Sequence, residues 1–311
     1  MTLALVFPGQ GSQSVGMLAD LAGEFPQVEQ TFAEASTALG YDLWHRVQNG
    51  PESELQLTAV TQPAMLTAGV AVWRAWLAAG GPAPAVMAGH SLGEYSALVC
   101  AGALPFAQAV QLVRQRGEFM QQAVPVGAGA MAAVLGLDRS AVEAACASAA
   151  TADEIVAVAN YNAPPQSVIA GHTAAVQRAS AAAQAAGAKR VVPLPVSAPF
   201  HCALMRPAAA ALTPPLEAAR IVAPAVPVIN NVDVAKVSEP AAIRDALIRQ
   251  IYSPVRWVEV IEAMAARGVT HVVECGPGKV LAGLTKRICG ELDSLAVQDP
   301  ASLRQALAAL T

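Results

Sequence analysis

The stretch AVMAGHSLGEYSA, residues 85–97, joins a short apolar run to a helix-compatible segment through Gly89-His90-Ser91-Leu92-Gly93. This G-x-S-x-G pattern between a strand and a helix is typical of a nucleophile elbow, in which a serine occupies a sharp, strained turn. The two glycines would let the strand and the helix approach closely, because neither carries a Cβ. Free backbone N–H groups at the start of the helix would face an oxyanion beside the serine. The stretch therefore predicts that Ser91 is a nucleophile in an α/β fold.

The composition narrows the class of protein. The 311 residues are 54% hydrophobic and 14% charged, which is enough for a large core. A net charge of −4 without a dominant basic run argues against nucleic acid as a partner. The chain has neither a signal-peptide pattern nor an apolar run long enough to span a membrane. Five cysteines without a C-x-x-C pair favour reduced, buried thiols. We expect a soluble, cytoplasmic protein.

Two glycine-rich turns resemble nucleotide-binding loops without matching them. The expected strand Leu3–Phe7 precedes Pro8-Gly9-Gln10-Gly11, but a dinucleotide fingerprint would need glycine where Ser14 stands. Gly278-Lys279 lacks the spacing of a phosphate-binding loop and is followed by Val280. The first loop is better suited to close backbone approach, with Gln10 supplying an amide. The histidines form no metal-ligand spacing, so we expect no metal and no cofactor.

Strand and helix patterns divide the chain into a larger and a smaller part. A helix beginning at Thr61-Gln62-Pro63 precedes the elbow strand, and a helix over 106–123 carries Arg116 beside its apolar stripe. Strands over 226–230 and 271–274 and a helix over 241–251 return to the larger part. We expect an α/β fold with a hydrolase-like core and a mainly parallel sheet, formed by 1–125 and 200–311.

The composition changes at Pro125, and a second pattern follows. Strands over 130–137, 155–159, 166–170 and 189–194 alternate with helices over 139–149 and 173–186. This βαββαβ order is that of a ferredoxin-like unit. We expect it to form a small domain, 126–199, inserted into the larger one, with 160–165 as the loop between its middle strands.

An acyl-transfer serine needs a base, and His201 follows the inserted unit. In an ordinary α/β-hydrolase the order is serine, then a carboxylate, then a histidine near the C-terminus. Here Asp233 follows His201, and 110 residues lie beyond the histidine. The group that orients His201 therefore need not be a carboxylate. The neighbouring Cys202 has no motif that would make it an alternative nucleophile.

Taken together, motifs spread along nearly all 311 residues closely resemble the malonyl-CoA:acyl carrier protein transacylases of bacterial fatty acid synthesis. They are Phe7-Pro8-Gly9-Gln10-Gly11-Ser12-Gln13, Gly89-His90-Ser91-Leu92-Gly93-Glu94-Tyr95, Arg116-Gly117, Asn162-Ala163-Pro164, Phe200-His201, Gln250 and Gly276-Pro277-Gly278. The resemblance implies that Ser91 is acylated and that His201 acts as base and then as acid. It also implies that the backbone carbonyl of Gln250 orients His201.

The resemblance assigns the remaining site residues as well. The N–H groups of Leu92 and Gln10 would form the oxyanion hole. Arg116 would bind the malonyl carboxylate, a role that suits a planar guanidinium where water is excluded. Asn162 and Phe200 would contact the substrate, and the Phe200 ring would crowd the branching methyl of methylmalonyl.

One position departs from the family's pattern. Pro165 stands where many members have glycine, which stiffens the loop after Asn162 and leaves the role of that asparagine open.

The implied function is ping-pong transfer of malonyl from malonyl-CoA to the phosphopantetheine thiol of holo acyl carrier protein. Alternatives from the same motifs are the malonyl-transferring subunit of a malonate decarboxylase and a polyketide-type acyltransferase. A thioesterase and a non-catalytic scaffold within a larger synthase are further alternatives. An acidic carrier protein would dock on basic residues. The candidates are Lys189, Arg190, Lys286 and Arg287.

Overall fold

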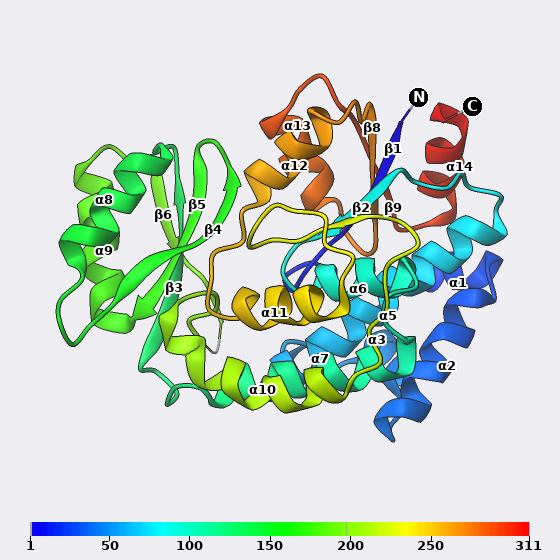
Figure 1. The fold of residues 1–311 in the computed structure, drawn as a ribbon, viewed down its shortest axis with the longest axis horizontal. Coiled ribbons are helices and arrows are strands. Elements are labelled where there is room, and N and C mark those ends of the chain that lie inside the picture. The colour runs from blue at the N-terminus through cyan, green and yellow to red at the C-terminus, as the bar shows by residue number, and fades with distance from the viewer. Residues whose placement is uncertain (1, 197, 311) are drawn as a thin grey trace.

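Two separate sheets organise the chain in the computed structural model, which describes residues 2–196 and 198–310 (Figure 1). The first sheet is parallel throughout, in the order β7-β2-β1-β8-β9. Its strands are β1 (Leu3–Phe7), β2 (Val86–Gly89), β7 (Val228–Ile229), β8 (His271–Cys275) and β9 (Asp293–Val297). The second sheet is antiparallel, in the order β4-β5-β3-β6. Its strands are β3 (Gly129–Leu135), β4 (Val156–Ala163), β5 (Gln166–His172) and β6 (Arg190–Pro193).

Helices cover both faces of the first sheet, which is why its strands other than the edge strand β9 are buried on both sides. One face is covered mainly by the N-terminal helices, by α5 to α7, and by α10, α11 and α14; α12 and α13 cover the other. The helices before β3 are α1 (Ala19–Glu24), α2 (Gln27–Leu39), α3 (Leu43–Asn49), α4 (Glu52–Leu55), α5 (Thr58–Ala78), α6 (Gly93–Cys100) and α7 (Phe106–Gln122). Those after it are α8 (Arg139–Ala149), α9 (Thr173–Ala185), α10 (Arg206–Ala218), α11 (Pro240–Gln250), α12 (Trp257–Ala265), α13 (Val280–Ile288) and α14 (Pro300–Ala309).

The alternation of side chains along β1 explains this two-sided core. Leu3, Leu5 and Phe7 belong to the cluster that includes α5, whereas Ala4 and Val6 belong to the cluster that includes α12. Successive residues of a strand point to opposite faces, so a central strand in a covered sheet must be apolar at every position. The predicted strand Leu3–Phe7 is confirmed, and the mainly parallel α/β core is confirmed with it.

The turn between β2 and α6 is as tight as the glycine pattern requires. Ser91 has φ 53°, in the left-handed region that a residue with a Cβ rarely adopts. A Cβ on Gly89 would collide with the backbone of Gly93, and a Cβ on Gly93 would collide with the carbonyl of Phe7 in β1. The absence of both Cβ atoms therefore lets β1, β2 and α6 meet at one point, with Ser91 at the carboxyl end of the sheet.

The second sheet has the ferredoxin-like order that the βαββαβ pattern predicts. Figure 1 shows α8 and α9 on its outer side, away from the first sheet, and both helices pack with this sheet in a core of their own. The boundaries at 126 and 199 remain a prediction. Backbone hydrogen bonds also connect the two parts: Val255 N donates to Ala159 O and Tyr161 N donates to Val255 O, each at 2.9 Å.

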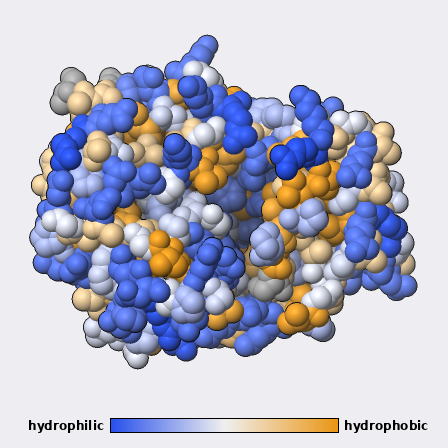
Figure 2. Space-filling model, turned by 180° about the vertical axis from the view of Figure 1, so that it is seen from behind, coloured by the Kyte–Doolittle hydropathy of each residue, from blue (hydrophilic) through white to orange (hydrophobic). Residues whose placement is uncertain are grey.

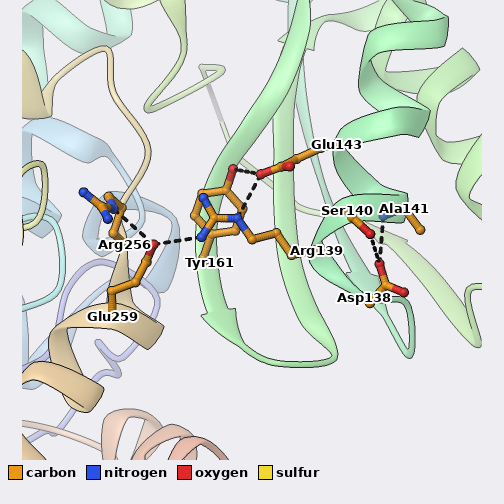
Figure 3. Close-up of polar contacts among 8 residues, drawn as sticks. All are labelled: Asp138, Arg139, Ser140, Ala141, Glu143, Tyr161, Arg256 and Glu259. Atoms are coloured by element: carbon orange, nitrogen blue, oxygen red, sulfur yellow. Dashed lines mark hydrogen bonds and ion pairs between the residues drawn. The ribbon is translucent and has the colours of Figure 1, made fainter. Parts of the chain in front are cut away.

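A cluster of charged side chains crosses the same junction (Figure 3). Arg139, on α8, pairs with Glu143 on its own helix at 2.9 Å and with Glu259 on α12 at 2.8 Å. Its guanidinium also lies 3.9 Å from the ring centroid of Tyr161, whose hydroxyl donates to Glu143 at 2.7 Å. Arg256 donates to Glu259 as well. Partly exposed ion pairs of this kind each contribute about 0.2–1 kcal/mol to the free energy of unfolding. They therefore hold the two parts in their relative orientation more than they stabilise the whole fold.

Two local predictions are wrong. α5 begins at Thr58 rather than Thr61, since Thr61 N already donates to Leu57 O and the missing N–H of Pro63 removes a single helical bond. Residues 160–163 are not a loop, because β4 continues through them with register shifts and only Pro164-Pro165 forms the turn. The hydrogen bonds to Val255, which forms an isolated bridge outside the strands, give this part of β4 a second backbone partner.

The cysteines match the sequence prediction only in part. All five cysteines are free, but Cys100 and Cys289 are only partly buried, so the prediction of buried thiols is wrong for these two. Within residues 2–196 and 198–310, no helix combines the length and the apolar character that a bilayer crossing needs.

The glycine contact at the elbow yields a stability test. Replacing Gly93 by Ala should destabilise the fold by about 2–3 kcal/mol or more, because the new methyl group collides with the backbone of β1 rather than with a movable side chain. Gly23→Ala, in α1, is the matched control: nothing lies within 4 Å of its Cβ position, so the helix should gain about 0.5–1 kcal/mol. Urea unfolding of both variants measures this difference. Equal stability of the two variants would contradict the packing argument.

Candidate active site

Ser91 and His201 form a hydrogen-bonded pair at the carboxyl end of the parallel sheet. Ser91 Oγ lies 2.7 Å from His201 Nε2, although 110 residues separate them in the chain. His201 lies after β6, at the start of the return from the second sheet, and has φ 58°. The family resemblance implied that these two residues act together, and the inserted unit, β3 to β6, accounts for most of the chain between them.

A backbone carbonyl orients the histidine. His201 Nδ1 lies 2.9 Å from Gln250 O, at the last residue of α11. Because a carbonyl oxygen can only accept, Nδ1 carries the proton and Nε2 is left to accept from Ser91 Oγ. Burial and, after it, the positive charge of Arg116 together lower the pKa of His201 to about 3. The imidazole is therefore neutral at ordinary pH and available as a base.

Arg116 places a buried positive charge next to the serine. Its side chain on α7 is 1% exposed, and Nη2 donates to Ser91 Oγ at 3.2 Å. Amide oxygens hold the guanidinium: Nη1 donates to Gln62 Oε1 and Nη2 to Gln250 Oε1, both at 2.9 Å. Among the described residues, no carboxylate forms an ion pair with Arg116. A buried cation without a direct counter-ion is suited to bind an anion.

Two backbone N–H groups at the site have no acceptor among residues 2–196 and 198–310. They belong to Leu92, just before α6, and to Gln10, in the loop after β1. The N–H of Ser91 itself is occupied, since it donates to Asn231 Oδ1 at 2.7 Å. Free N–H groups beside a nucleophile can stabilise an oxyanion.

A cavity of about 130 Å³ contains these groups. It is lined by Gln10, Gln62, His90, Ser91, Leu92, Arg116, Met120, Met131, Asn160, Leu194, Val196, Phe200 and His201. Residues from the turns that follow β1 and β2 and residues from the second sheet contribute, and Figure 2, from behind, shows the surface hollowed at the junction of the two parts, with apolar surface beside the hollow. A lining that combines apolar side chains with converging polar groups is typical of a small-molecule site.

The structure separates Asn162 from the other predicted site residues. Its Oδ1 accepts from His90 Nε2 at 2.8 Å, which ties β4 to the elbow, and it does not line the cavity. Asn160, two residues earlier on the strand, lines the cavity instead and is 7% exposed. Both asparagines lie in the part of β4 where its pairing with β5 shifts register.

Three polar residues at the site escaped the sequence analysis. Gln62 and Asn231 hold Arg116 and the backbone of Ser91, and Glu94 is 2% exposed within hydrogen-bond distance of Gln250 and Asn231. For Glu94, its position as a charged residue in an otherwise apolar helix after the elbow could have indicated a role at the site. The other two had none, because amide side chains are common in helices and turns.

The neutral histidine can be tested directly. NMR titration should find the His201 imidazole uncharged, with its proton on Nδ1, down to about pH 4, because burial and Arg116 both disfavour the charged form. Arg116→Met should raise the pKa of His201, since it removes a positive charge from the site. The signals of His45, exposed on α3, should be the same in both proteins. An unchanged His201 titration in the variant would show that Arg116 does not act on the base.

Several known proteins are similar in sequence to this chain over nearly its whole length. The family model described as the acyl transferase domain matches residues 4–299. The malonyl CoA-acyl carrier protein transacylase of Escherichia coli K12 is 60% identical over 304 residues, 98% of each chain. The Bacillus subtilis protein of that description is 46% identical over 308 residues, 99% of this chain and 97% of its own.

Solved structures of similar proteins have nearly the same fold as this chain. The malonyl CoA-acyl carrier protein transacylase of Coxiella burnetii has a TM-score of 0.98 at 51% identity, covering 100% of this chain and 98% of its own. A malonyl-transacylase in complex with its type II PKS acyl-carrier protein has a TM-score of 0.98 at 57% identity, covering 99% of this chain and 100% of its own. The chain belongs to the acyl transferase family, among the malonyl CoA-acyl carrier protein transacylases.

Proposed function

We propose that this acyltransferase moves a malonyl group from malonyl-CoA to the phosphopantetheine thiol of holo acyl carrier protein, through a malonyl ester on Ser91, for fatty acid synthesis. The observation that carries the proposal is the buried guanidinium of Arg116, which has no carboxylate partner among residues 2–196 and 198–310 and lies 3.2 Å from the oxygen of a histidine-paired serine. When the acyl group carries a carboxylate, a cation beside the nucleophile is needed to bind that carboxylate.

In the first half-reaction, Ser91 Oγ attacks the thioester carbonyl carbon while His201 Nε2 takes the hydroxyl proton. The carbonyl oxygen becomes an oxyanion, which the N–H groups of Leu92 and Gln10 stabilise. As the oxyanion collapses, the carbon–sulfur bond breaks. The leaving thiolate takes the proton from Nε2, so that coenzyme A departs as a thiol and Ser91 carries a malonyl ester.

The second half-reaction runs the same steps with a different thiol. His201 Nε2 takes the proton of the phosphopantetheine thiol, whose sulfur attacks the ester carbonyl. Collapse of the oxyanion breaks the bond to Ser91 Oγ, which recovers the proton from Nε2. The same imidazole serves as base and then as acid in each half-reaction. Throughout, Nδ1 keeps its proton and donates a hydrogen bond to the backbone carbonyl of Gln250.

Arg116 selects the acyl group by pairing with the free malonyl carboxylate. The guanidinium needs no reorientation, because Gln62 and Gln250 already hold it, and one N–H of Nη1 is left for an incoming anion. The Phe200 ring, in the wall of the cavity, favours malonyl over methylmalonyl by crowding a branching methyl group.

Basic residues at one end of the second sheet are our candidate docking patch for the carrier protein. Arg190 pairs with Leu135 beside Gln166, and Arg287 on α13 donates to Gln166 Oε1 at 2.9 Å. Lys189 and Lys286 are neighbours in sequence of these arginines, and all four basic side chains are exposed. An acidic partner would be steered towards such a patch. A cytoplasmic location is part of the same proposal.

A second candidate function differs in the acceptor. The relative solved with a type II PKS acyl-carrier protein shares 57% of this sequence, so a polyketide carrier protein is a specific alternative acceptor. Parallel assays with a fatty-acid carrier protein, a polyketide carrier protein and a malonate decarboxylase carrier subunit distinguish the candidates by kcat/KM.

The transfer can be followed directly. Incubation with radiolabelled malonyl-CoA should give a stable ester on Ser91, and addition of holo acyl carrier protein should move the label to the carrier thiol. Ser91→Ala should remove the adduct, because the nucleophilic oxygen is lost. Label on another residue, or rapid release of free malonate without an acceptor, would contradict the mechanism and favour a hydrolase.

Arg116→Ala tests the recognition of the carboxylate. Malonyl transfer should fall by about one to two decades, the effect of losing a charged hydrogen bond of about 1.5–3 kcal/mol, while the slower transfer of acetyl changes much less. Arg114→Ala is the matched control on the same helix, since Arg114 is exposed and its only ion pair with a described residue is the one with Glu118. Equal losses for malonyl and acetyl would remove Arg116 from carboxylate recognition.

A further inference from the structure

Glu94 is a buried carboxyl group next to the site that no step of the transfer uses. It is the second residue of α6 and is 2% exposed. Both of its recorded hydrogen bonds reach the same oxygen, Oε2: Gln250 Nε2 donates at 2.8 Å and Asn231 N at 2.9 Å. An acidic residue in the first turn of a helix usually serves the N–H groups of that turn. Glu94 instead accepts from two other segments of the chain.

The bond to Asn231 connects Glu94 to the elbow. Asn231 follows β7, and its side chain spans the nucleophile turn: Oδ1 accepts from Ser91 N at 2.7 Å and Nδ2 donates to Gly89 O at 2.8 Å. Ser91 has a left-handed backbone, which persists only where the surroundings enforce it. By fixing the backbone of Asn231, Glu94 fixes the clamp that holds Ser91.

The bond to Gln250 connects Glu94 to the other two groups of the site. The side chain of Gln250 donates to Ser91 O at 3.0 Å and accepts from Arg116 Nη2 at 2.9 Å, while its backbone carbonyl faces His201 Nδ1. The amide of Gln250 has one orientation that satisfies these bonds, with its oxygen towards Arg116. The accepting oxygen at position 94 enforces that orientation, because only the NH₂ group of Gln250 can donate to it.

We propose that Glu94 is a positioning residue for acyl transfer, whose Oε2 holds the nucleophile turn, the orienting residue of the base and the guanidinium in one arrangement. The proposal deepens the transfer function and rests on it. Burial raises the pKa of Glu94 to about 7, and hydrogen bonds from Gln250 and Asn231 oppose the rise, followed by the charge of Arg116. The two hydrogen bonds need an acceptor oxygen rather than a full negative charge, so a glutamine can replace it.

Glu274 provides a matched control. It is also a fully buried carboxyl group, on β8, and burial raises its pKa to about 7 as well. Its Oε2 accepts from Ala282 N at 2.8 Å in the first turn of α13, so its hydrogen bond is local to that helix and does not reach the serine. Removing either carboxyl group should cost stability, but only one of them should affect the reaction.

The experiment compares Glu94→Ala, Glu94→Gln and Glu274→Ala, each corrected for the folded fraction by thermal unfolding. Glu94→Ala should lower kcat about 10- to 100-fold for malonyl and acetyl loading alike, since a small misplacement of reacting groups has effects of that size. Glu94→Gln should retain kcat within about threefold, because its carbonyl oxygen can accept both bonds. Glu274→Ala should retain kcat despite a lower melting temperature.

The rate at which a fluorophosphonate labels Ser91 gives a second readout that needs no malonyl or carrier protein. It should fall in Glu94→Ala and recover in Glu94→Gln. If the wild-type protein labels Ser91 but moves no malonyl to a thiol, the transfer function fails while the positioning role is still measured. A Glu94→Ala protein with unchanged kcat and labelling, a Glu94→Gln protein as impaired as Glu94→Ala, or an equal loss of kcat in Glu274→Ala would overturn the proposal.

Discussion

The contact of β1, β2 and α6 at Gly89 and Gly93 is the constraint on which the site depends. Backbone meets backbone there, and neither position has room for a Cβ. The turn that results holds Ser91 at φ 53° with its hydroxyl beyond the sheet, beside the free N–H groups of Leu92 and Gln10. Since the strands are parallel, their carboxyl ends meet at one edge, so β1, β2 and β7 deliver Gln10, Ser91 and Asn231 to the same place.

Around this turn the protein keeps two opposite charges buried without letting them pair directly. Arg116 and Glu94 both contact the side-chain amide of Gln250, on its oxygen and its nitrogen respectively. A direct ion pair would satisfy both charges and leave no attraction for a substrate carboxylate. The amide between them keeps the guanidinium open to an anion, and that uncompensated positive charge helps to hold His201 neutral. Recognition of the acyl group and basicity of the histidine therefore share one electrostatic origin.

The second sheet contributes by enclosing the reaction rather than by supplying its chemistry. Met131 on β3, Asn160 on β4 and Leu194 after β6 line the cavity opposite the elbow. Contacts that hold this sheet against the first include the backbone bonds of Val255 to β4, the ion pair of Arg139 with Glu259 on α12, and the hydrogen bond of Asn162 with His90. An enclosed, mostly apolar cavity strengthens every electrostatic interaction inside it, which suits a site that relies on one guanidinium and two N–H groups.

The sequence by itself determined the elements whose signals are local: the elbow with Ser91, the strand Leu3–Phe7 and the βαββαβ order. The family resemblance of motifs along the chain added the roles of His201, Gln250 and Arg116. Neither the local signals nor the resemblance gave an expectation for α1 to α4, α10, α12 and α14 or for β9, and of these only α1, α3 and α4 are too short to show a clear periodicity. The resemblance also placed Asn162 at the substrate, whereas in the structure Asn162 bonds to His90 and Asn160 lines the cavity. Only the tertiary structure decided the roles of Gln62, Glu94 and Asn231. Their hydrogen bonds join residues 54 to 156 positions apart, and such distances leave no periodicity in the sequence.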